Sequence, residues 1–160
     1  MQGVALSEIC FPPRDTPVQD PVSTAAAEAV RQLRAYFSNP GFIPDLPLAD
    51  QGTAFQRRVW KALRAIPPGE VLTYGALARR LGSAARAVGG ACRANPCPIL
   101  VPCHRVVAVH GTGGYAGATR GPWLTIKEHL LRHEGVVWPP SAARPAPDGA
   151  CRCRSGPLAP

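Results

Sequence analysis

Hydrophobic residues recur with a helical period between residues 24 and 37. Val30, Leu33 and Phe37 form one face of the helix that this spacing predicts. Thr24 is its candidate N-cap, because a threonine hydroxyl can accept hydrogen bonds from the backbone N–H groups of the first turn. The pattern therefore predicts one amphipathic helix near the N-terminus.

A second apolar stripe predicts a helix over residues 53–66, after a Pro-rich connection at residues 40–52. The stripe consists of Phe55, Val59, Leu63 and Ile66. Pro67-Pro68-Gly69 follows it and cannot continue a helix. The helix is therefore expected to end at that point.

Two shorter helices are predicted next, over residues 74–81 and 84–94, with Thr73 as the cap of the first. Gly82-Ser83 makes a tight turn between them. This spacing is typical of a helix-turn-helix, although ordinary helix packing can produce it as well.

The remaining elements are short. The apolar runs at residues 4–11 and 99–101 each predict one strand, and residues 105–109 are expected to be extended. Residues 111–117 hold four glycines and predict a flexible or tightly turned loop. A last helix is predicted over residues 123–133, with Gly135 as its stop. Its inward positions are Ile126, Leu130 and Leu131.

Composition narrows the function classes. Of 160 residues, 46% are hydrophobic, which is enough for a packed core. The net charge of +8 favours a polyanionic partner, with nucleic acid ahead of an anionic membrane surface, although an Arg-rich protein without such a partner has the same charge. The sequence contains no run of 18 apolar residues, so no transmembrane helix is predicted. The N-terminus does not resemble a signal peptide. We therefore expect a cytoplasmic protein whose six cysteines are mostly thiols.

The residues most suggestive of chemistry are Cys103 and His104, between two strand-like runs. A cysteine beside a histidine suggests an activated thiol, and Glu134 is a candidate to orient the imidazole. Neighbours in a strand point to opposite faces, so a turn or a bridging water would have to connect the pair. The alternative is an inert buried cysteine beside a surface histidine. A metal site is disfavoured, because Cys92, Cys97, Cys103 and His104 are irregularly spaced.

The helix predicted over residues 84–94 has two different sides. Ala85, Val88 and Cys92 can face the core, whereas Arg86, Gly90 and Arg93 lie opposite. That second side is basic and nearly flat, which suits a minor groove about 6 Å wide. A solvated basic helix face is the plainer interpretation.

A DNA-repair hypothesis combines these features. Arg86 is placed to enter the base stack, and Tyr74 could contact the backbone or a nucleotide flipped out of the duplex. A thiolate suits displacement at an alkyl carbon bound to oxygen. The thioether product is stable, so this chemistry implies one turnover per molecule.

The motifs around Cys103 closely resemble those of the O6-alkylguanine-DNA alkyltransferases (methylated-DNA–protein-cysteine methyltransferases). The central motif is Pro102-Cys103-His104-Arg105-Val106, preceded by Arg86-Ala87-Val88-Gly89-Gly90 and Asn95-Pro96. Upstream matches include Thr53-Ala54-Phe55-Gln56, Val59-Trp60, Gly69-Glu70 and Thr73-Tyr74, and downstream matches include Tyr115, Lys127-Glu128 and His133-Glu134-Gly135. The resemblance covers residues 50–136 in the family's order.

The resemblance implies a role for each matching position. Cys103 would accept the alkyl group, His104 would act as its base through a water, and Glu134 would orient His104. Arg86 would replace the flipped guanine, and Tyr74 would press on the adjacent phosphate. Asn95 would join the recognition helix to the active-site segment. The DNA-contacting helix positions would be Ala85, Arg86, Gly90 and Arg93. The pocket would be lined by Val106, Tyr115, Ala116, Gly117 and Lys127, with the carbonyls of Cys103 and Val106 facing the guanine amino group.

The implied fold is α+β. A mostly helical alkyltransferase domain at residues 49–138, with a winged-helix-like helix-turn-helix and short strands, would follow a truncated RNase H-like α/β region at residues 1–48. Residues 139–160 are expected to form a disordered tail. The substrate would be O6-alkylguanine, and also O4-alkylthymine, in double-stranded DNA. The implied protein is a monomer that needs neither cofactor nor metal. Ala116 departs from the serine or other polar residue that members often carry there.

Two other functions remain open. One is a DNA-binding module that senses alkylated bases without transferring the alkyl group. The other is a cysteine hydrolase with a Cys103–His104–Glu134 triad, against which the basic helix-turn-helix and the lack of an evident oxyanion loop argue.

Overall fold

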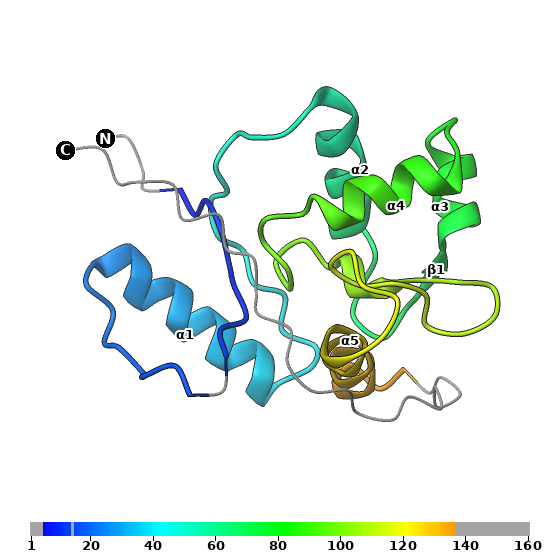
Figure 1. Cartoon of the computed structure of the whole chain (residues 1–160). Coiled ribbons are helices and arrows are strands. Elements are labelled where there is room, and N and C mark those ends of the chain that lie inside the picture. Colours follow the sequence, from blue (N-terminus) through cyan, green and yellow to red (C-terminus); the bar gives the residue numbers. More distant parts are fainter. Residues whose placement is uncertain (1–4, 14, 137–160) are drawn as a thin grey trace.

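The computed structural model describes residues 5–13 and 15–136 of the chain (Figure 1). In these parts the chain is mostly helical, and its named strands are very short. The elements are α1 (Thr24–Ser38), α2 (Ala54–Arg64), β1 (Leu72–Thr73), α3 (Tyr74–Arg80), α4 (Ala85–Arg93), the 3₁₀ turn η1 (Cys103–Arg105), β2 (Val106–Val107) and α5 (Pro122–His133). The tail predicted at residues 139–160 lies outside the described residues.

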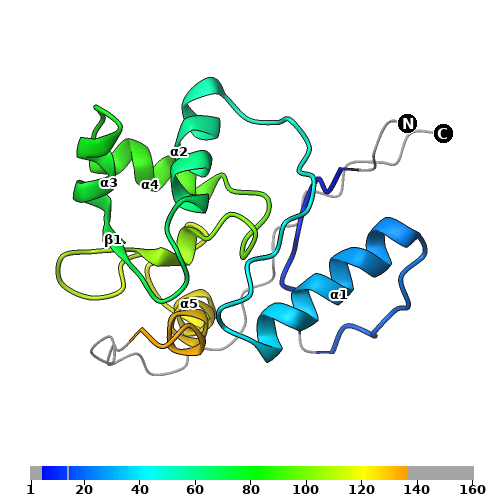
Figure 2. The same cartoon turned by 180° about the vertical axis from the view of Figure 1, so that it is seen from behind.

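Helix α1 lies apart from α2, α3 and α4 (Figure 1), and its C-terminal part contacts α5 through Tyr36 and His133. In Figures 1 and 2 the N-terminal segment and the linker before α2 run between α1 and the group of α2, α3 and α4. Two predictions for this region were wrong. The N-cap is Ser23 rather than Thr24, and the buried face holds Ala29, Gln32 and Tyr36, while Phe37 is 47% exposed. Tyr36 faces inward because its hydroxyl donates a hydrogen bond to the buried Glu134 side chain. Phe37 has no hydroxyl and could not make this bond.

The strand predicted at residues 4–11 is only an isolated bridge between Leu6 and Leu48. Leu6 donates to the carbonyl of Pro47 and accepts from the N–H of Ala49, so the N-terminal segment lies along the linker without entering a sheet. Among the described residues, no sheet of an RNase H-like region is present before α2.

Helix α2 begins as the sequence predicts. Thr53 accepts a hydrogen bond from the N–H of Gln56, and the Gln56 side chain accepts one from the N–H of Thr53, which together make a capping box. Val59 and Leu63 are fully buried. The Trp60 indole donates to the carbonyl of Ala91 at 2.9 Å, which ties α2 to α4.

The helix-turn-helix is confirmed. Thr73 caps α3, a turn at Gly82 with φ near +61° follows, and α4 packs across α3 and α2. Strands β1 and β2 pair in parallel, with Leu72 opposite Val106 and Thr73 opposite Val107. This pairing places the start of α3 beside the end of η1.

The segment between α4 and β2 differs from its prediction. Ile99, Leu100 and Val101 are buried as expected, but they form a turn rather than a strand, and Ile99 has φ near +75°. The extended run predicted at residues 105–109 is reduced to the two residues of β2. The apolar run correctly predicts that these residues are buried. A strand and a packed turn can both be buried, so the run does not predict which of the two forms.

Within the described residues, no helix is long and apolar enough to cross a membrane.

Candidate active site around Cys103

Cys103 begins η1 and is 5% exposed. Its sulfur accepts a hydrogen bond from Nδ2 of Asn95 at 3.2 Å. Asn95 also donates to the carbonyl of Val101 at 2.8 Å and accepts from the N–H of Cys97 at 3.0 Å. One amide therefore fixes the segment between α4 and the thiol and touches the sulfur itself.

Burial raises the pKa of the Cys103 thiol. The Asn95 hydrogen bond, the nearby charge of Lys127 and the Tyr115 hydroxyl favour the thiolate, but they do not overcome the loss of solvation. Burial thus favours the neutral thiol in the unbound protein, and the activated thiol that the sequence suggests stays a prediction. A base must take the proton when the sulfur reacts.

His104 is fully buried, and its Nε2 lies 2.8 Å from Oε1 of Glu134. Burial lowers the pKa of His104, so the imidazole is neutral near pH 7. A carboxylate only accepts hydrogen bonds, so Nε2 carries the proton and Nδ1 keeps its lone pair. Nδ1 has no hydrogen-bond partner among the described residues. The ring is therefore oriented as a base whose free nitrogen is Nδ1.

Glu134 lies at the C-terminal end of α5 and receives several donors. Arg105 binds it through both Nε and Nη2 at 2.8 Å, and the Tyr36 hydroxyl donates to Oε1 at 2.8 Å. Burial disfavours the carboxylate charge, but the hydrogen bonds from His104 and Arg105 and the charge of Arg105 hold the pKa of Glu134 well below its usual range. Glu134 is thus a fixed anion at neutral pH.

Sequence reasoning missed two members of this group. Arg105 was visible in the motif beside His104, and its burial at 5% exposed distinguishes it from a surface arginine. Tyr36 is separated from Glu134 by 98 positions in the chain. No spacing rule connects residues so far apart, so Tyr36 could not have been found from the sequence pattern.

A cavity of about 520 Å³ lies in front of the sulfur, between α3, α4 and the loop before α5. It brings together most of the predicted site residues. Those that line it are Tyr74, Ala85, Arg86, Gly90, Arg93, Cys103, Tyr115, Ala116 and Gly117. His104, Glu134, Asn95, Val106 and Lys127 are not among the lining residues and lie behind it.

The surface of α4 agrees with its predicted basic side, since Arg86, Gly90 and Arg93 are exposed. Ala85 was also expected to face the core, and this was wrong. It occupies the first position of α4 and is exposed at the cavity. Val88 and Cys92, further along the helix, are buried in the core, whereas the first turn lies outside it.

Lys127 is fully buried and holds the glycine-rich loop in place. Its Nζ donates to the carbonyls of Val106 and Thr112 at 2.6 Å and of Gly114 at 3.0 Å. Burial lowers the pKa of Lys127 to about 8. Tyr74 supports the same loop, because its hydroxyl donates to the carbonyl of Gly114 at 3.0 Å.

The tip of this loop has an unusual backbone. Ala116 has φ near +49° and Gly117 φ near +84°. A Cβ on Gly117 would come within 2.8 Å of Nε of Arg93, so the Arg93 side chain packs directly on the glycine. The Tyr115 hydroxyl is buried beside the sulfur and makes no regular hydrogen bond to a described residue.

Comparison with known proteins agrees with this geometry. The family model for the DNA-binding domain of 6-O-methylguanine DNA methyltransferase matches residues 54–136. A methylated-DNA–protein-cysteine methyltransferase of Shigella flexneri is 55% identical over 110 residues, covering 66% of this chain and 61% of the relative. One from Homo sapiens is 47% identical over 113 residues, covering 64% and 52%. The chain thus spans about three fifths or less of the length of these two relatives.

A solved structure resembles the chain over a longer region. The Mycobacterium tuberculosis OGT in complex with DNA is 38% identical, with a TM-score of 0.62, and the match covers 84% of this chain and 83% of that one. The family match extends over more than half of the 160 residues and includes Cys103, His104 and Glu134. The chain therefore belongs to the 6-O-methylguanine DNA methyltransferase family.

Proposed function

We propose that this protein repairs alkylated DNA by moving the alkyl group from O6 of guanine, or O4 of thymine, to the sulfur of Cys103. The observation that carries this proposal is the position of the sulfur. It lies in a cavity that opens beside the exposed basic side of α4, with the His104–Glu134 pair behind it. The names of the relatives describe, for those proteins, transfer of a methyl group from methylated DNA to a protein cysteine.

The proton path follows from the protonation states. The Cys103 thiol passes its proton, through a water, to Nδ1 of His104, and Glu134 stabilises the imidazolium through Nε2. The thiolate then attacks the alkyl carbon. The S–C bond forms and the C–O bond breaks, and the electron pair of the C–O bond stays on the oxygen of the nucleobase. The nucleobase then takes up the proton that the thiol gave to His104. Because the thioether is stable, each protein molecule carries out a single transfer.

Three residues are suited to hold the base: Tyr115 and Cys103, which line the cavity, and Val106, which follows η1. The Tyr115 hydroxyl stays protonated because burial raises its pKa, and it has a hydrogen bond to give to a purine or pyrimidine. The carbonyls of Cys103 and Val106 already accept from the Val106 N–H and from Lys127. Each carbonyl has a second lone pair for the guanine amino group.

Entry of the base requires that it leave the duplex. The flat stretch at Gly90 lets α4 approach the minor groove closely, and Arg93 adds positive charge. Arg86 is exposed at the cavity mouth and fills the space that the flipped base leaves in the stack. Tyr74 lies across the cavity, where it contacts the nucleotide or its phosphate.

Three further proposals concern the setting. We propose that residues 1–48 form a region of their own and residues 49–138 the alkyltransferase domain; the hydrogen bond from Tyr36 to Glu134 joins the two. The protein acts in the cytoplasm, where the thiols of Cys92, Cys97 and Cys103 stay reduced. It acts as a monomer, because one chain carries all residues of the site.

Intact-mass spectrometry tests the reaction. After incubation with a duplex that contains O6-methylguanine, the protein should gain the mass of one methyl group, and Cys103→Ala should gain none. Binding without a mass change would instead identify a damage sensor, and turnover of an ester or amide would identify a hydrolase.

A matched pair of arginine variants tests the role of α4. Arg86→Ala should slow transfer from duplex DNA far more than transfer from the free base O6-methylguanine, whereas Arg132→Ala, which removes an exposed charge from α5, should slow neither. Equal losses of Arg86→Ala on both substrates would contradict the base-replacing role.

A further inference from the structure

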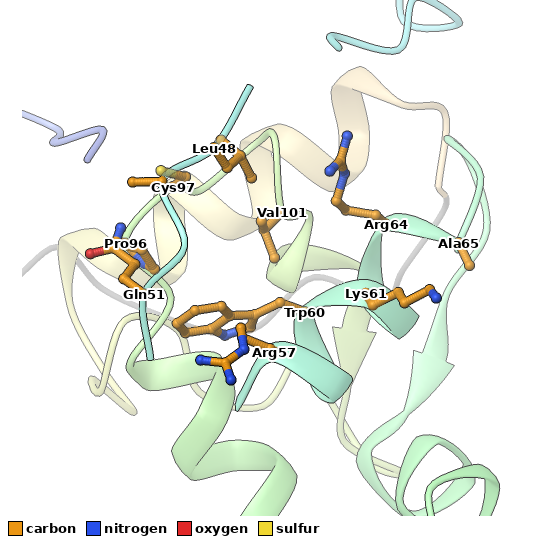
Figure 3. Close-up of a pocket in the computed structure, with 11 residues that line it drawn as sticks. Leu48, Gln51, Arg57, Trp60, Lys61, Arg64, Ala65, Pro96, Cys97 and Val101 are labelled. Atoms are coloured by element: carbon orange, nitrogen blue, oxygen red, sulfur yellow. The ribbon is translucent and has the colours of Figure 1, made fainter. Parts of the chain in front are cut away.

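A second cavity, of about 470 Å³, lies on the far side of the Asn95 segment (Figure 3). Its walls come from the linker before α2, from α2 itself, and from the turn that precedes Cys103. It shares no lining residue with the cavity in front of the sulfur. The proposed alkyl transfer at Cys103 therefore does not involve this second cavity.

The floor of this cavity is apolar and holds a fixed aromatic ring. In Figure 3 the indole of Trp60 lies in the middle of the cavity, with Lys61 and Arg64 toward one end and Gln51 and Pro96 toward the other. The hydrogen bond from Trp60 to the carbonyl of Ala91 holds the ring in place. A fixed indole face is a stacking platform for a planar ring, and little conformational freedom is lost when one binds.

The rim of the cavity is cationic. Arg57, Lys61 and Arg64 follow each other at helical spacing on one side of α2. Arg57 pairs with Asp50 at 3.6 Å and Arg64 with Asp45 at 3.0 Å, and both carboxylates are almost fully exposed. Such surface pairs contribute little and exchange easily. Among the described residues Lys61 has no carboxylate partner, so the rim carries one uncompensated positive charge.

An aromatic platform beside an uncompensated cation selects a planar ring that carries an anionic group. The volume falls within the range of small-molecule sites. We propose that this cavity binds a nucleotide, with the base stacked on Trp60 and the phosphate at Lys61. The nucleotide comes either from the free pool or from a single strand of DNA, which offers the same base and phosphate.

The bound nucleotide would lie against the segment that positions the sulfur. Pro96, Cys97 and Val101 form the wall of the cavity, and Asn95 bonds to both Cys97 and Val101 as well as to the sulfur. A nucleotide in this cavity would therefore restrict the motion of the turn that precedes Cys103, on the side away from the sulfur.

Nuclear magnetic resonance of the indole N–H groups tests this site on the full chain. Titration with deoxyadenosine monophosphate, or with a short single-stranded oligodeoxyadenosine, should shift the signal of Trp60, which is assigned with Trp60→Phe. Adenine probes avoid the guanine chemistry at Cys103. A shift with the free nucleotide supports a pool ligand, and a shift with the oligonucleotide alone supports a DNA strand. Deoxyribose 5-phosphate, which has no ring to stack, should leave the signal in place.

Two charge-removing variants make the test specific. Lys61→Gln changes an exposed side chain and should weaken binding about fivefold, whereas Arg132→Gln removes one exposed charge far from the cavity and should not. Cys103→Ala should bind as the parent does, which separates this site from the proposed repair reaction. No Trp60 shift with either adenine probe, or an equal weakening in Lys61→Gln and Arg132→Gln, would overturn the proposal.

Discussion

Cys103 and His104 are neighbours in η1, but they belong to different surroundings. Cys103 faces a cavity of about 520 Å³, and its sulfur accepts a hydrogen bond from Asn95, with the Tyr115 hydroxyl beside it. His104 faces a sealed group of polar side chains in which Glu134 accepts from three others. One side of the turn is open and sparsely bonded, and the other is closed and densely bonded.

This difference separates the two tasks of the site. The closed side keeps its charges at neutral pH, because the pKa of Glu134 lies well below its usual range. The open side must change its charge, because burial raises the pKa of Cys103 above that of an ordinary thiol. A fixed anion that orients a neutral base can receive the proton that the thiol gives up. Mutations on the closed side should therefore act on stability, and on transfer where they disturb His104, whereas mutations on the open side should act mainly on transfer.

The largest effect is expected from Glu134→Ala. It leaves Arg105 as an unpaired buried charge and His104 without its orienting partner. Breaking a buried pair by removing one partner costs about 3–5 kcal/mol. Denaturant unfolding should show a loss of this size, and transfer should fall with it. Glu70→Ala removes an exposed carboxylate and should cost almost nothing. A similar small loss in Glu134→Ala would mean that the closed side is not a stabilising cluster.

The same cluster should make stability depend on pH. The pKa of Glu134 is lower in the folded chain than its ordinary 4.5, so the folded state binds fewer protons than the unfolded state below that pH. The stability that the carboxylate provides is present above pH 4.5 and is lost as the pH falls. The lowered pKa of His104 acts in the same direction below its ordinary 6.5.

Unfolding midpoints between pH 7 and pH 3 measure this dependence. The parent should lose stability across the range, and Glu134→Gln should give a flatter curve below pH 4.5. Parallel curves for the two proteins would show that Glu134 does not titrate in this way.

On the open side, Asn95→Ala should affect transfer more than folding. It removes the donor to the sulfur, so the thiolate loses a stabilising partner and the pKa of Cys103 should rise further. The loss of one such hydrogen bond slows transfer about tenfold. Single-turnover rates from pH 7 to pH 9 should show the rate of the variant rising at a higher pH than that of the parent. An unchanged pH profile would mean that Asn95 only supports the turn.

The sequence predicted the parts of this arrangement that depend on neighbouring residues. The Thr73 cap, the buried stripe of α2 and the exposed arginines of α4 all follow from local spacing, and all are confirmed. It failed where distant contacts decide the backbone. Ile99 is β-branched and a strand residue by preference, but packing holds it at positive φ.

The closed cluster shows the same limit. Glu134 and His104 were chosen from the sequence, and the structure places them 2.8 Å apart. The third and fourth members, Arg105 and Tyr36, give no local signal of their role. The face of α1 was predicted from apolar residues alone, and that rule favours Phe37 over its polar neighbour Tyr36. A buried tyrosine is recognised only when its hydroxyl partner is known.

The smallest expected effect also tests how the N-terminal region joins the site. Tyr36→Phe removes one hydroxyl and leaves the ring packed against His133. Glu134 keeps its bonds to His104 and Arg105, so the variant should lose about 1 kcal/mol of unfolding free energy, the net value of one hydrogen bond. Its transfer rate should stay close to that of the parent, because the proton path does not include Tyr36. Phe37→Leu, a change at a half-exposed neighbour on α1, provides the control and should cost less. If Tyr36→Phe instead slowed transfer as strongly as Asn95→Ala, the hydroxyl would help set the basicity of His104, and Tyr36 would take part in the chemistry as well as in stability.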